Sequence, residues 1–432
     1  MCTLPTKLLC SDVRPTRYRT RIGAVCLRRI HSIVILKSQY ASAMKMSLFA
    51  YGFRSQFFLA GMAAVLLVPL WALSFIAGTP LGTGWPPTLW HAHEMLFGFI
   101  ACTIAGFMLT AVPSWTGQKG FAGRPLMVLA AVWIVARVLI VTSSTWPPIL
   151  PALVDLAFLP LLAVLVMIPL LRCRNRNTPL LAVLGAFWLT DVAFYVGLLG
   201  HDAPLALKAV IVGIDITLLL VTVIGGRIVP AFTTAALRAQ GRDANLQSRT
   251  ALTRLSILAM VSVIIGDIFW PNSRIAGWIA GVAAVLQILR LAQWRTLLTL
   301  RQPIVWILHV AYAWLPVGLA LKSAALLGAY ALAAFWLHAL TIGALTTMIV
   351  AVMTRASLGH TGRPLRVHSL ITLAYSLLVG ATVIRVFGLL LPGVSYPAVI
   401  AAAAILWTAS FLLFIGIYSP ILWGPRADGK SG

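Results

Sequence analysis

The chain has 432 residues, of which 60% are hydrophobic and only 10% are charged, against roughly 25% charged residues in an average soluble domain. A soluble protein of this size needs more polar surface, so the composition excludes a soluble fold. The net charge of +24 could indicate a nucleic-acid partner, but between residues 55 and 425 the bases lie mainly in short connections between long apolar runs. This distribution is typical of a polytopic protein in a lipid bilayer and indicates no nucleic-acid partner.

The chain begins with a basic extension, residues 1–45, that contains no run long enough to cross a membrane. Its apolar patch, residues 30–36, is short, and six arginines precede it. One interpretation is a disordered arm that binds anionic lipid. The alternative is a start-site artefact, with translation beginning at Met44 or Met46 directly before the first apolar run. A cleaved signal peptide is not indicated, because the h-region and a small-residue cleavage site are absent.

Twelve apolar runs follow, each long enough to cross a bilayer core, which requires roughly 20 helical residues. The sequence therefore predicts an all-α fold: one twelve-helix transmembrane domain over residues 46–424, followed by a short cytoplasmic tail, residues 425–432. The predicted spans lie near residues 57–77, 89–112, 125–142, 149–171, 179–199, 205–229, 250–270, 275–294, 304–327, 331–353, 367–390 and 396–418.

The connections between these runs alternate in basic content. Residues 78–88, 143–148 and 391–395 contain no lysine or arginine, whereas residues 172–176 and 355–366 contain three arginines each. Basic connections remain in the cytoplasm, so this alternation predicts that both termini are cytoplasmic and that the basic-poor connections face outside.

Several charged residues lie inside the predicted spans. Charges at this depth are costly and mark functional sites or structural pairs. With the predicted topology they all fall toward the outer side of the membrane, which favours ion pairs among them and one polar site there; the alternative is separate structural pairing at helix ends. They are Glu94, Asp155, Asp191, Asp215, Asp267, Arg137 and Arg385.

The second span opens with Trp90-His91-Ala92-His93-Glu94-Met95. On a helix His91, Glu94 and Met95 share a face, while His93 points about 200° away from His91. The two histidines therefore cannot easily bind one ion from an unbroken helix. Imidazole is a common ligand of haem iron and copper, so His93 could serve one cofactor and His91 another. Alternatively, His91 lies at the membrane interface, where it is hydrated next to the outer loop.

The tenth span contains a second candidate ligand, His338. The second and tenth spans have similar exits, with a threonine followed by a Gly-Arg-Pro string, and His93 lies 17 residues before Thr110 while His338 lies 16 residues before Thr354. Both imidazoles then lie about 25 Å from the inner boundary. Two histidines at one depth could hold a single haem from both sides. Alternatively, each of the two histidines forms a hydrogen bond with a neighbouring carbonyl.

The exit of the sixth span, Gly225–Pro230, is a similar glycine-to-proline string. Each of spans two, six and ten is the second span of a successive group of four. The pattern suggests three four-helix repeats.

His309 lies about five residues into the ninth span, which the chain enters from Arg301 on the predicted cytoplasmic side. It is therefore about 8 Å deep from that face and cannot reach the level of His93. It belongs either to a second cofactor site or to the helix packing.

Five segments resemble the NnrS family, and the resemblance as a whole covers roughly residues 50–420. The resemblance implies a twelve-helix bacterial inner-membrane protein that contains haem and copper and takes part in the response to nitric oxide. His91, His93 and Glu94 match the family's HAHE string, and His309 and His338 match histidines in later strings. Residues 1–45 have no counterpart. The segments are WHAHEMLFGF (90–99), AGFMLTAVPSWTG (105–117), GGRIVPAFT (225–233), HVAYAWLPVGLALK (309–322) and HALTIGALTTMIVAVMTRASLGHTGRP (338–364).

The resemblance favours a haem protein, with copper as a second possible metal, that binds nitric oxide or handles electrons from a donor the sequence does not identify. The expected haem residues are His93, His338 and His309, and the expected metal ligands are His91, His93, Glu94 and His338. Two other classes stay open: a proton-coupled transporter that uses the outer carboxylates, and a membrane enzyme that reduces nitric oxide.

The catalytic subunits of haem–copper oxidases and nitric oxide reductases also have twelve helices, with histidines on spans two and ten. This similarity is a fold-level analogy. Those enzymes place their copper histidines on spans six and seven, where this chain has Asp215 and Asp267. A binuclear centre of that pattern is therefore not expected.

Overall fold

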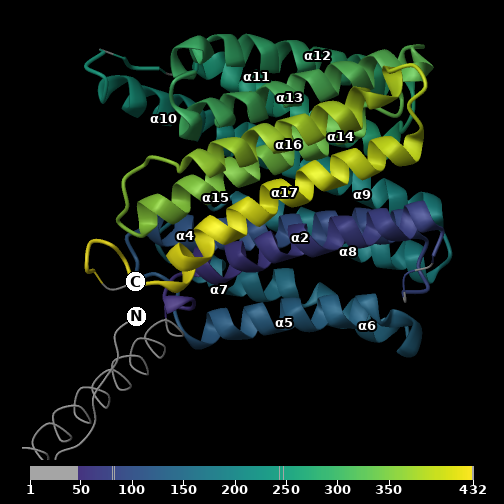
Figure 1. Cartoon of the computed structure of the whole chain (residues 1–432), viewed down its shortest axis with the longest axis horizontal. Helices are drawn as coiled ribbons and strands as arrows, with labels where there is room; N and C mark the ends of the chain where they lie inside the picture. The colour runs from purple at the N-terminus through teal and green to yellow at the C-terminus, as the bar shows by residue number, and fades with distance from the viewer. Residues whose placement is uncertain (1–46, 80, 82, 243, 247, 431–432) are drawn as a thin grey trace, which may run out of the picture. The chain divides into compact units, whose positions relative to one another are not determined.

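The computed structural model describes residues 47–79, 81, 83–242, 244–246 and 248–430 (Figure 1). Within these ranges the chain forms helices and connecting loops, with no β-strand. The predicted extension, residues 1–45, lies outside the described residues. Twelve helical spans are long and apolar enough to cross a membrane, which confirms the predicted all-α membrane fold.

The spans follow one another in chain order, and several are built from more than one helix. Their bounds are α2 (Gly52–Ala77), α3–η1–α4 (Pro87–Thr116), α5 (Arg124–Val141), α6–α7 (Ile149–Arg172), α8 (Leu180–Leu199), α9–η3–α10 (Ala203–Arg238), α11 (Thr250–Phe269), α12 (Arg274–Ala292), α13 (Pro303–Leu326), α14–η6–α15 (Trp336–His360), α16–η7 (Ser369–Leu390) and α17 (Tyr396–Trp423).

Helices are the expected structure here, because a backbone surrounded by lipid must satisfy its polar groups internally. Consecutive spans pack against each other, as α8 does on α9 and α16 on α17. The first and last spans, α2 and α17, are also neighbours, and Figure 1 shows the purple and yellow helices side by side. Nη1 of Arg54 reinforces this contact by donating to the carbonyl oxygen of Gly424 at 2.6 Å.

Spans two, six and ten form the inner part of the bundle. The most apolar window of each is 78%, 67% and 67% buried, that of α13 is also 67% buried, and those of the other spans are 28% to 44% buried. Two cavities lie between these three spans, one of about 360 Å³ and one of about 110 Å³. The side chains of these inner spans are therefore the ones placed to bind a molecule inside the protein.

Each of these inner spans contains a π-helical segment: η1 (Glu94–Ile100), η3 (Val221–Gly225) and η6 (Ala339–Thr346). In η6 a side chain also follows the wider turn: the hydroxyl of Thr346 donates to the carbonyl of Thr341, five residues back, at 3.0 Å. Such segments are rare and are frequent at functional sites. Their recurrence every four spans supports the three four-helix repeats that the sequence suggests.

Candidate functional site

The larger cavity lies between α2, the start of the second span, α9, the tenth span, α16 and α17. Its volume of about 360 Å³ is in the range of small-molecule and cofactor sites, roughly 300–1,000 Å³. Most of its wall is aliphatic or aromatic. The polar residues in the lining are Thr88, His91, His338, Thr341, Thr346, Arg385 and Tyr396.

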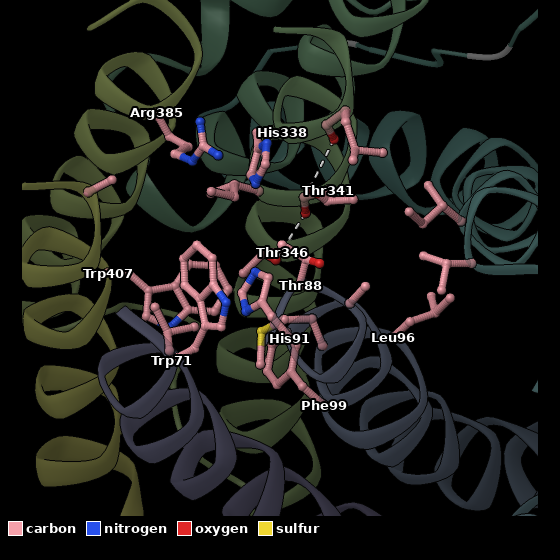
Figure 2. A pocket seen from close by; sticks show the side chains of 18 of the residues that line it. Trp71, Thr88, His91, Leu96, Phe99, His338, Thr341, Thr346, Arg385 and Trp407 are labelled. Carbon is pink, nitrogen blue, oxygen red and sulfur yellow. Dashed lines mark hydrogen bonds between the residues drawn. The ribbon is translucent and has the colours of Figure 1, made fainter. Parts of the chain in front are cut away.

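Two imidazoles face each other across this cavity. Figure 2 shows the ring of His338 on one side and the ring of His91 on the other, with Trp71 and Trp407 beside His91. The indole of Trp71 stacks on His91 with ring centroids 4.1 Å apart. The Nδ1 atoms of both histidines are buried and form no hydrogen bond with any described residue. The pair therefore has unused ligand capacity inside an apolar space.

The other polar groups of the cavity differ in their availability. The hydroxyls of Thr341 and Thr346 donate to backbone carbonyls at 2.9 and 3.0 Å. Arg385 donates from Nη2 to the hydroxyl of Tyr396 at 2.9 Å, and no carboxylate of the described residues lies within ion-pair distance of it. Arg385 can therefore neutralise an anionic group of a bound molecule.

A buried cluster of charges lies next to the cavity wall and is built on His93. Nδ1 of His93 is 3.1 Å from Oε1 of Glu94. Its Nε2 is 3.1 Å from Oδ2 of Asp155 and 3.4 Å from Oδ1 of Asp191. The imidazole thus lies between three carboxylates, which come from the second, fourth and fifth spans. We refer to His93, Glu94, Asp155, Asp191 and their partner Arg137 as the His93 cluster.

Arg137, on α5, supplies the positive charge of the His93 cluster. Nη1 is 2.9 Å from Oε1 of Glu94, and Nη2 forms a short ion pair with Oδ1 of Asp155. Tyr195 donates its hydroxyl hydrogen to Oδ2 of Asp155 at 3.0 Å. The ion pairs expected between Arg137 and the carboxylates are confirmed.

A second charged group lies on α9, α11 and α13. Lys322 forms a short ion pair with Asp267, and its Nζ is 3.9 Å from Oδ2 of Asp215. The ammonium group also lies 4.9 Å from the ring centroid of Trp336. Sequence reasoning missed Lys322 as an intramembrane charge. The signal was available, since a ninth span that runs outward places its last turns at the level of the acids.

The structure divides the polar site expected from the sequence into three places. Asp155 and Asp191 belong to the His93 cluster, whereas Asp215 and Asp267 pair with Lys322. Arg385 faces the cavity. Among the described residues, no ion pair within 4 Å connects these groups. The expectation of one shared site is wrong, because a common depth in the membrane does not imply a common side of the helices.

The expected pairing of His93 with His338 also differs from the structure. His91 is the histidine that lines the cavity with His338, and His93 points into the carboxylates. Residue counting fixes depth along a helix but not the direction of a side chain. Glu94 was expected on the face of His91, yet its carboxylate lies against His93, where Arg137 attracts it. The expected metal ligands are thus divided between the cavity and the His93 cluster.

His309 is a packing residue in this structure. Its Nε2 is 2.8 Å from the hydroxyl of Thr233, and its Nδ1 is 3.0 Å from the hydroxyl of Thr296. Both ring nitrogens therefore have partners within the protein. This geometry favours the packing interpretation over a second cofactor site.

Comparison with known proteins identifies the family. The family model described as NnrS protein matches residues 47–426, which include the cavity, both groups of charges and all twelve spans. None of the curated proteins compared with the chain matches it. The protein is a helical membrane protein of the NnrS type, and the chain belongs to the NnrS family.

Proposed function

We propose that this protein is a haem protein of the nitric oxide response in the bacterial inner membrane, and that His91 and His338 hold the haem. The observation that carries the proposal is the pair of imidazoles that face one apolar cavity from two different spans. His93 and His309, which the sequence also suggested for haem, have partners elsewhere and are not included.

The residues of the cavity fit a haem. His91 and His338 would hold the iron of a haem through their imidazole nitrogens. The aromatic rings of Trp71, Phe99 and Trp407 belong to the wall and suit a flat apolar macrocycle. Arg385 and Tyr396 lie at its polar part and are placed to bind a carboxylate substituent.

When bound, haem iron supplies one-electron chemistry and affinity for nitric oxide. Two imidazoles on one iron favour electron transfer, whereas an open position favours gas binding. Because both histidines are present, we propose electron handling as the primary role, with an electron donor outside this chain. The link to nitric oxide and to the bacterial inner membrane is what the resemblance to the NnrS family implies, and the family match supports that resemblance.

The experiment is an optical spectrum of the detergent-purified protein, compared with His91→Ala, His338→Ala and His309→Ala. Both cavity variants are expected to lose haem or change its spin state, because no other imidazole lines the cavity. His309→Ala is the control, since its ring nitrogens bond to threonines. A colourless preparation of the unmodified protein from haem-replete cells contradicts the proposal, as does an unchanged spectrum in both cavity variants.

A proton-coupled transporter is the second candidate, and one observation favours it. Asp215 is buried within the sixth span, and neither of its carboxylate oxygens has a hydrogen-bond partner among the described residues. A carboxyl group in this state can take up and release a proton. Proton uptake into liposomes that contain the protein, lost in Asp215→Asn and retained in His338→Ala, is the result expected for a transporter.

A further inference from the structure

We propose that His93, Asp155 and Asp191 form a binding site for one divalent first-row transition-metal ion, separate from the haem cavity. Nε2 of His93 and one carboxylate oxygen from each aspartate would be the ligands. They come from the second, fourth and fifth spans. The proposal goes beyond the haem function, because none of these three residues lines the cavity.

The distances match a metal site. The donor atoms of the three residues all lie within 4.8 Å of one another. At a metal–ligand distance of about 2.1 Å, neighbouring ligands are about 3.0 Å apart in an octahedral site and about 3.4 Å apart in a tetrahedral one. His93 Nε2 is 3.1 Å from Oδ2 of Asp155 and 3.4 Å from Oδ1 of Asp191. These separations allow both oxygens and the nitrogen to bind one ion with little movement.

The donor atoms are also available. Nε2 of His93 and Oδ1 of Asp191 are buried and have no hydrogen-bond partner with acceptable geometry among the described residues. Both residues are at most 2% exposed. Buried polar atoms are normally satisfied, so these two atoms, 3.4 Å apart, require either a shared proton or a ligand bound by both. The third donor atom, Oδ2 of Asp155, accepts the hydroxyl hydrogen of Tyr195 and keeps a second lone pair.

The surroundings orient the ligands as the outer shell of a metal site does. Oε1 of Glu94 is 3.1 Å from Nδ1 of His93, which places a hydrogen on Nδ1 and leaves the lone pair of Nε2 for the metal. Arg137 binds Oδ1 of Asp155 and thereby leaves Oδ2 directed toward His93.

The charges of the cluster require a counter-ion. Glu94, Asp155 and Asp191 carry three negative charges when ionised, and Arg137 supplies one positive charge. In a buried site at membrane depth, an excess of two negative charges is costly. A divalent cation removes this excess. Protonation of His93 and of one carboxyl group gives the same balance and is the alternative that the experiment must separate.

The ligand set defines the class of ion. One imidazole and two carboxylates suit Mn²⁺, Fe²⁺, Zn²⁺ or Cu²⁺, whereas Cu⁺ prefers thiolate and thioether ligands. In the described residues no cysteine belongs to the group. The proposed ligands share only His93 with the metal ligands expected from the sequence, which were His91, His93, Glu94 and His338.

The experiment measures non-haem metal in the full-length protein, purified in detergent and incubated separately with Mn²⁺, Fe²⁺, Zn²⁺ and Cu²⁺ before desalting. We expect about one ion per chain for at least one of these metals. Asp191→Asn keeps the shape of the side chain and removes its charge, so it should lower the metal affinity by more than the 10–100-fold typical of outer-shell changes. Asp267→Asn is the matched control, because Asp267 pairs with Lys322 and does not belong to the His93 cluster. This variant should retain the metal.

A second measurement does not depend on any variant. The ion that binds should raise the melting temperature of the unmodified protein, because a ligand of the native state stabilises it. Absence of a bound ion with all four metals overturns the proposal and favours protons in the cluster. Retention of metal in Asp191→Asn, or equal loss in Asp267→Asn, overturns it as well. His91→Ala separates the two sites. Its optical spectrum should show the loss of haem, while its content of non-haem metal should be unchanged.

Discussion

At the scale of single residues, two glycines determine where buried guanidinium groups can lie. A Cβ atom at Gly98 would be 2.6 Å from Nη1 of Arg137, and a Cβ atom at Gly226 would be 2.0 Å from Nη2 of Arg290. Arg137 binds the carboxylates of the His93 cluster. A side chain at either position would therefore require the end of an arginine side chain to move, and at Gly98 that arginine is held by two carboxylates.

Gly98→Ala tests this steric role. The added methyl group should push Arg137 away from Glu94 and destabilise the protein by about 1–3 kcal/mol, the usual cost of overpacking a core. Gly185→Ala is the control, because a Cβ atom there meets no atom within 4 Å and alanine is the better helix former. The thermal melting temperature is the measurement. Equal melting temperatures for the two variants would show that Arg137 can move freely.

At the scale of secondary-structure elements, π-helical segments decide which side chains meet. Directly after η6, the hydroxyl of Thr347 also donates to a carbonyl five residues back, that of Ile342 in η6, at 3.1 Å. In η3 the carbonyl of Thr222 accepts from Nη1 of Arg290 at 2.7 Å. Side chains thus stabilise these wide turns. As a result, residues before and after each segment point in directions that an unbroken α-helix would not produce.

Deletion of Ala344 from η6 tests this inference. Removing one residue rotates the chain on one side by about 100° relative to the other. His338 should then leave its place opposite His91, and the haem spectrum should disappear. Deletion of Val394 from the exposed loop before α17 is the control and should preserve the spectrum. A normal haem spectrum after deletion of Ala344 would contradict the role of the π-helical register.

At the scale of the whole molecule, contact between the first and last spans closes the bundle around the inner ones. The cavity depends on this closure, since α2 provides Trp71 and α17 provides Trp407 to one wall. Spans two and ten, which are far apart in the sequence, provide His91 and His338 to the same space. The site is therefore a property of the assembled bundle and not of any one hairpin.

The orientation of the bundle is a prediction at this scale. The alternation of basic connections predicts that residues 78–88, 143–148 and 391–395 face outside and that residues 355–366 face the cytoplasm. Single cysteines at Thr79, Thr145 and Val394 should react with a membrane-impermeant thiol reagent in intact spheroplasts.

A cysteine at Arg366 should react only after lysis. Cys173, which is exposed, must be replaced by serine in the background, together with the three N-terminal cysteines. Protection of the three outer positions in spheroplasts would reverse the predicted orientation.

The sequence by itself determined the fold class and the number of spans. An apolar run of about 20 residues is stable in lipid only as a helix. The hydropathy of the sequence was therefore sufficient to predict the fold class and the number of spans. The predicted twelve spans all occur, although the sixth extends to Arg238 and the tenth to His360, because helices continue past the apolar run where polar turns can be solvated. The strings around His91 and His338 also identified the family correctly.

Only the tertiary structure decided which ionisable groups meet. Position along a helix gives depth, but the direction of each side chain depends on helix rotation and on the π-helical turns. Helix geometry predicts that His91 and His93 point in opposite directions, but it does not tell that His91 lines the cavity with His338 while His93 lies between Asp155 and Asp191. A partner on another span is chosen by packing between helices, and no local pattern of residues encodes that choice.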